Sequence, residues 1–84
     1  MTKWKVVVTE YASNARSRSL GEFATPRLAA SAAVVHASKA VDQFKRDGVL
    51  CYFIGDEHSP SKPVTVKSRT TQRVLMTINV EATK

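Results

Sequence analysis

One long alanine-rich segment, residues 25–48, lies between two stretches rich in β-branched residues. Thr25 has a hydroxyl that can cap free backbone N–H groups, and Pro26 has the fixed φ that suits the first helical position. Gly48 can adopt the left-handed conformation that ends helices, and the cations just before it suit the C-terminal end of the helix dipole. The sequence therefore predicts a single helix packed on a sheet that the rest of the chain forms.

The helix is predicted to turn one apolar face toward the sheet, at about 100° per residue. That face is mostly alanine, so the helix can approach the sheet closely; its members are Ala30, Ala33, Val34, Ala37, Ala40, Val41 and Phe44. Leu28 and Val35 project from the polar side instead. We expect a loop or a chain terminus to cover these two side chains, and the alternative is an exposed docking stripe.

Strands are indicated on both sides of the helix by alternation with a period of two. They are expected at residues 3–11, 20–24, 49–54, 64–69 and 73–81. Gly21 permits a bulge that brings Leu20 and Phe23 to one face, and residues 12–19 form a basic turn. Residues 49–54 are apolar on both faces, which is typical of a central strand.

The predicted fold class is α+β, with one antiparallel β-sheet in the order β-β-α-β-β-β and one long helix packed on one face. Residues 1–84 form a single domain. The helix-facing side chains on the strands are expected to be Trp4, Val6, Val8, Val64, Val66, Val74, Met76, Ile78 and Val80.

The other face of the sheet is left open by this layout. Alternation assigns to it Lys5, Val7, Thr9, Tyr11, Leu50, Tyr52, Ile54, Thr65, Lys67, Arg69, Arg73, Leu75, Thr77 and Asn79. Such a mixture of aromatic, aliphatic and basic groups suits contact with a partner. The alternative is that the 55–63 loop or a second copy of the chain partly covers it.

The amino-acid composition indicates which classes of partner suit the chain. Thirteen Lys and Arg against seven Asp and Glu give a net charge of +6, which favours nucleic acid or an acidic protein surface. The lone cysteine, Cys51, excludes an intrachain disulfide and fits a reducing cytoplasm. The apolar run near the N-terminus is too short for a signal peptide, and no stretch is apolar enough for a membrane span. We expect a cytoplasmic monomer or homodimer.

Catalytic chemistry is not indicated. Asp56, Glu57 and His58 are consecutive and lack the spacing of a metal motif, so a solvated turn is expected there. His36 has no acidic partner fixed by spacing, and Cys51 lies in an apolar strand as an inert thiol. The sequence predicts no enzyme, no metal site and no cofactor.

Basic residues carry the predicted interaction instead. Arginines on the 12–19 turn and cations around the last hairpin suit phosphates or carboxylates, and a tyrosine on the open face could stack on a base. The candidate partner-binding residues are Arg16, Arg18, Tyr52, Lys67, Arg69 and Arg73.

In length and layout the chain resembles the small phage-encoded anti-CRISPR proteins, some of which share this element order. The resemblance covers most of the chain: a strand over residues 3–11, a polar turn, a return strand ending at Ala24, a helix started by Thr25, and three further strands. It implies a cofactor-free inhibitor that binds a CRISPR-Cas complex or nuclease and blocks DNA binding or cleavage. The basic charge departs from members that imitate DNA with acidic surfaces. The alternatives are a nucleic-acid-binding module and a structural protein of a phage or mobile element.

Overall fold

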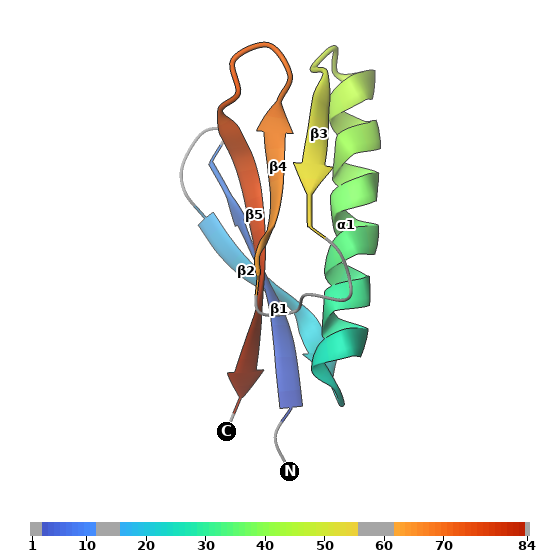
Figure 1. The fold of residues 1–84 in the computed structure, drawn as a ribbon, viewed down its shortest axis with the longest axis vertical. Helices are drawn as coiled ribbons and strands as arrows, with labels where there is room; N and C mark the ends of the chain where they lie inside the picture. Colours follow the sequence, from blue (N-terminus) through green and yellow to red (C-terminus); the bar gives the residue numbers. More distant parts are fainter. Residues whose placement is uncertain (1–2, 12–15, 56–61, 84) are drawn as a thin grey trace.

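A computed structural model describes residues 3–11, 16–55 and 62–83 and has a single antiparallel sheet with one helix across it (Figure 1). The elements are β1 (Lys3–Glu10), β2 (Arg16–Phe23), α1 (Pro26–Arg46), β3 (Cys51–Ile54), β4 (Val64–Ser68) and β5 (Val74–Thr83). Within these residues the strands lie in the order β2-β1-β5-β4-β3, and α1 contacts all five. The predicted α+β fold with the order β-β-α-β-β-β is confirmed.

Both ends of α1 form as their residues predict. The Thr25 hydroxyl accepts a hydrogen bond from the Leu28 N–H at 3.1 Å, and Pro26 occupies the first turn. At the other end Gly48 takes a φ of +83°. There the Gly48 N–H donates to the Lys45 carbonyl and the Val49 N–H to the Phe44 carbonyl, the paired bonds of a Schellman motif.

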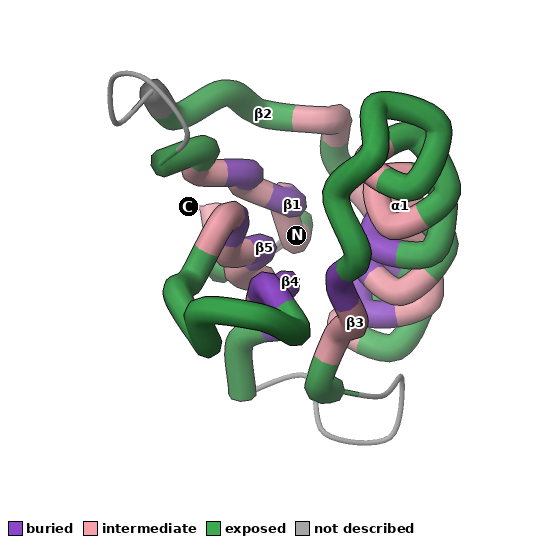
Figure 2. The backbone as a smooth tube through the Cα atoms, turned by 90° about the horizontal axis from the view of Figure 1, so that it is seen from above, coloured by how far each residue is buried: buried purple, intermediate pink, exposed green. Residues whose placement is uncertain are grey.

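The core lies between α1 and the sheet, where the buried residues of the helix are turned toward those of the strands (Figure 2). Ala33 and Ala37 are fully buried there, and Ala29 joins the predicted face. Across from them the largest fully buried side chains are Ile78, Val6, Val8 and Val66. Because alanine has no side chain beyond Cβ, valines and isoleucine of the sheet fill the space between the layers.

The β1–β2 hairpin differs from the prediction in its length. β2 begins at Arg16 rather than at Leu20, because Arg16 and Arg18 pair with Glu10 and Val8 of β1. Residues with a turn-like sequence are thus held as a strand by their cross-strand partners. The expected bulge is present: the register shifts opposite Val6 and Val7, and Gly21 has a φ of +134°.

Two further strand assignments are corrected. β3 is an edge strand of four residues, not a central one, because β5 takes the centre between β1 and β4. A bulge in the β4–β5 pair places Val74 opposite Lys67, and Val74 is therefore 39% exposed instead of buried. The same bulge lets Leu75, expected on the open face, pack partly against the core.

Candidate functional site

Among the described residues, large apolar side chains are exposed both on the sheet with its connections and on the helix. One group comprises Tyr11, Val49, Leu50, Ile54 and Val74, at the sheet and the connection that enters β3. The other group is Leu28 and Val35 on α1, exposed by 54% and 51%. No described loop or terminus covers these two helix residues, contrary to the expectation. Each group marks a candidate contact surface.

The open face, as we name the sheet face opposite α1, is not uniformly apolar. Its middle is a row of hydroxyl side chains, because Thr65 pairs with Thr77 and Thr77 with Thr9. Near the start of β1, Lys5 and Glu81 form an exposed ion pair at 3.7 Å. On β3 the exposed apolar side chain is Ile54, which pairs with Thr65, and the exposed Val74 of β5 is opposite Lys67 of β4. A contact surface on this face is thus centred on its β3 side.

Tyr52 and Lys67 are brought together at this β3 side. They are cross-strand partners, and Lys67 is in turn paired with Val74 of β5. The Tyr52 hydroxyl donates a hydrogen bond to Gln72 Oε1 at 2.6 Å, which holds the ring against the β4–β5 turn. The result is a fixed aromatic ring with a cation beside it and an exposed valine next in line.

The two tyrosines come from strands that are not neighbours in the sheet. Tyr11 follows β1 and hydrogen-bonds Thr77 of β5, whereas Tyr52 lies on β3, with β5 and β4 between the two strands. The backbones of β1 and β3 are three strand spacings apart, about 14 Å, and the Tyr11 hydroxyl reaches as far as Thr77 on β5. Sheet-based binders of single-stranded RNA stack two or three successive bases on a shared aromatic platform. This arrangement does not provide such a platform.

The candidate arginines are divided between two surfaces. Alternation predicts Arg69 and Arg73 on the open face, and Arg16 and Arg18 are predicted on the 12–19 turn. Arg69 and Arg73 are exposed near the β4–β5 turn, at the end of the molecule where α1 finishes (Figure 1). Arg69 leaves the open face and lines a hollow of about 320 Å³ with Lys45 and Asp42 of α1. Past the β4–β5 bulge the alternation that assigned Arg73 to the open face no longer applies.

The arginines of β2 lie elsewhere. Arg18 pairs with Val8, a helix-facing position of β1, and its guanidinium lies 3.9 Å from the Glu10 carboxylate. Arg18 therefore belongs to the α1 side of the sheet, on the edge opposite β3. The backbone of Arg16 is part of β2, and its side chain lies outside the described part of the structure.

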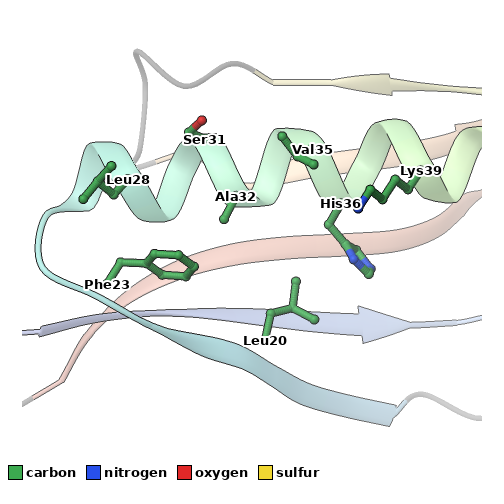
Figure 3. A pocket seen from close by; sticks show the side chains of 8 residues that line it. All are labelled: Leu20, Phe23, Leu28, Ser31, Ala32, Val35, His36 and Lys39. Carbon is green, nitrogen blue, oxygen red and sulfur yellow. The ribbon is translucent and has the colours of Figure 1, made fainter.

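A groove runs between β2 and α1, and sequence reasoning did not find it. Figure 3 shows Leu20 and Phe23 pointing from β2 toward the helix and Ala32 pointing back at them. This hollow has a volume of about 410 Å³; its lining residues are Leu20, Phe23, Leu28, Ser31, Ala32, Val35, His36 and Lys39. A second hollow of about 380 Å³ shares His36 and Lys39 and extends to Arg18, Glu10 and Asp47. The sequence signal for the groove was the position of Leu28 and Val35 off the helix's apolar face.

His36 lies where the two hollows meet. Burial lowers the pKa of His36 below its ordinary value, and the positive charges of Arg18 and Lys39 act in the same direction, while Glu10 opposes them. The imidazole is therefore neutral near pH 7. Among the described residues that line the apolar hollow, Lys39 is then the one with a charged side chain.

Cys51 is buried at the start of β3. Desolvation raises the pKa of its thiol, and the positive charge of Arg69 opposes that rise. The Sγ atom lies 4.0 Å from the Val41 carbonyl, so the thiol can donate only weakly. A thiol with a raised pKa and little exposure is a poor nucleophile.

Cys51 is accordingly expected to react slowly with Ellman's reagent in the folded protein at pH 8, about tenfold or more slower than in guanidinium chloride. The physical reason is that both access and thiolate fraction are reduced in the fold. A Cys51→Ala, Ser38→Cys variant, with its thiol on the exposed side of α1, is the control and should react at the unfolded rate. Equal rates for Cys51 in the two states would contradict its burial.

No group of three or more metal-ligating side chains occurs in residues 3–11, 16–55 and 62–83. Asp56, Glu57 and His58 lie outside the described residues. In the described part of the chain, no helix combines the length and apolar character needed to cross a bilayer. Comparison with family models, curated proteins and solved structures finds no match for the chain.

Proposed function

We propose that this chain is a non-enzymatic binding protein that inhibits by occupying a surface of another protein, in the manner of the anti-CRISPR proteins. The observation that carries the proposal is the fixed Tyr52–Lys67 pair on the β3 side of the open face, with exposed Ile54 and Val74 beside it. Tyrosine is one of the residue types enriched in protein-binding hot spots, and a ring held in place by a hydrogen bond loses little conformational freedom on binding.

Charge at the neighbouring end of the molecule supports an acidic target. Arg69 and Arg73 add two exposed cations at the β4–β5 turn, whose Gln72 accepts the hydrogen bond from Tyr52, and the Arg69 side chain lies on the α1 side of that turn. Cations at the rim of an apolar patch raise the rate of association with an acidic surface and disfavour binding to a basic surface. That the target is a CRISPR-Cas effector is part of this proposal, and it rests on the resemblance in layout.

Nucleic-acid binding is the second candidate, and the cations near the β4–β5 turn are the observation in its favour. Phosphate contacts by Arg69 and Arg73 would need no stacking platform. The separation of the two tyrosines favours the protein target over base recognition.

The test is expression of the protein in bacterial strains whose CRISPR systems, of several types, restrict a phage. The expected result is restored plaque formation in at least one strain, with an effector that co-purifies through gel filtration. Arg69→Glu combined with Arg73→Glu should weaken binding to that effector by about tenfold or more, since charge reversal at a binding patch turns attraction into repulsion. Lys3→Glu combined with Arg27→Glu changes the net charge equally at exposed sites at the starts of β1 and α1, the end of the molecule opposite the β4–β5 turn (Figure 1), and should leave binding unchanged.

Two results would contradict the proposal. If no strain shows restored plaques, the anti-CRISPR assignment is wrong. If purified protein shifts random DNA or RNA, with affinity falling by about one counterion per phosphate contacted as salt rises, the protein is a nucleic-acid binder.

A further inference from the structure

β2 is an edge strand with room beside it. It spans eight residues, pairs with β1 on one side, and has no strand on its other side in the described part of the chain. Half of the N–H and C=O groups of such a strand point away from the sheet and can accept a further strand. The other edge strand, β3, has only four residues. A short edge offers few hydrogen bonds, so β2 is the more capable acceptor.

The groove beside this edge is apolar on both walls. The bulge at Gly21 interrupts the alternation of β2, and both Leu20 and Phe23 consequently face α1 (Figure 3). From the helix, Leu28 and Val35 are half exposed along the same hollow. Side chains at every second position of a strand added to β2 would face this groove.

We propose that the groove between β2 and α1 binds an extended segment of a partner protein, which adds to the free edge of β2 as a sixth strand. Main-chain hydrogen bonds to β2 supply affinity, and the groove selects the side chains, as in other cases of strand addition. This surface is separate from the open face, so the inference goes beyond the proposed function and does not depend on it.

The charged side chains that line the groove indicate what kind of partner segment would bind there. The first hollow is apolar where Phe23 and Leu28 line it, and Lys39 lines it with no carboxylate among the lining residues. The adjoining hollow is of mixed charge, because Arg18 and Lys39 line it together with Glu10 and Asp47. The fitting segment is therefore apolar at its groove-facing positions near Phe23 and acidic at the position near Lys39.

A second copy of the chain fits this groove less well. It would bring a net charge of +6 against another +6, and would add its own Arg16 and Arg18 to an edge that already carries them. Like charges across an interface oppose association. An acidic segment of another protein has the complementary charge.

The test uses the full-length protein and a displayed library of random octapeptides, because eight residues match the length of β2. Enriched peptides are expected to carry apolar residues at alternate positions and Asp or Glu toward one end. Their affinity, measured by fluorescence anisotropy with synthetic peptide, should fall by about tenfold on Val35→Glu. Lys39→Glu should remove the preference for the acidic residue. N-methylation of alternate peptide amides should abolish binding, because it removes the donors that pair with β2.

Ile54→Glu is the matched control, since Ile54 is as exposed as Val35 and lies on the open face. It should leave peptide affinity unchanged, and unaltered circular dichroism of both variants confirms that neither change unfolds the protein. The inference is overturned if no peptide is enriched over an unrelated protein, or if Val35→Glu binds enriched peptides as tightly as the original chain. A dimer that Val35→Glu dissociates in light scattering would also overturn it, because the occupant would then be a second copy.

Discussion

Replacing Ile78 with alanine is expected to lower the free energy of unfolding by about 2–5 kcal/mol. Ile78 lies on the central strand β5, opposite Val8 of β1 and Val64 of β4, and is 1% exposed. Truncation removes the branched side chain that fills the space facing the alanines of α1, and the short helix side chains cannot extend into the cavity. For a small domain, with a total stability on the order of 5–15 kcal/mol, this loss is a large fraction.

Urea unfolding followed by circular dichroism measures this effect. Ile54→Ala is the control, because Ile54 is of the same type but 52% exposed on an edge strand; its change should stay within about 0.5 kcal/mol. Equal destabilisation by the two substitutions would contradict the placement of the core between β5 and α1.

Enlarging Ala37 to leucine is expected to destabilise the fold by about 1–3 kcal/mol. Ala37 is fully buried on the face of α1 that packs on the sheet, so the added methyl groups must displace either the helix or the strands. A lower melting temperature in calorimetry is the expected readout.

Ser38→Leu is the matched control for Ala37→Leu. Ser38 is the next residue of the same helix and is exposed, so the added side chain meets solvent. Its melting temperature should change little. An unchanged melting temperature for Ala37→Leu would mean that the helix does not approach the sheet as closely as its alanine face requires.

The sequence predicted which types of residue form the candidate site better than it predicted where those residues lie in the fold. Tyr52 and Lys67 were assigned to one face by alternation alone, and they are cross-strand partners there. Arg69 was assigned to the open face by alternation and Arg18 to the 12–19 turn, but the structure places them on opposite edges of the α1 side. Alternation fails near turns and bulges, because one extra residue moves all later side chains to the other face.

Local sequence determined the helix and its limits. Thr25, Pro26 and Gly48 act through hydrogen bonds and backbone angles within a few residues, so their effect can be read without knowledge of the rest of the fold. The alanine face of α1 was determined in the same way, because a helix repeats its geometry regularly and one face must be buried against something.

Strand order was decided only by the tertiary structure. The β3 sequence is apolar on both sides and predicts a central strand, yet the chain places β5 between β1 and β4 and leaves β3 at the edge. Pairing partners are distant in sequence, and a strand's own residues do not encode which neighbours it has. The same reason explains the exposure of Leu28 and Val35: whether a side chain off the helix's apolar face is covered depends on where the edge strand β2 lies, and β2 leaves a groove beside them.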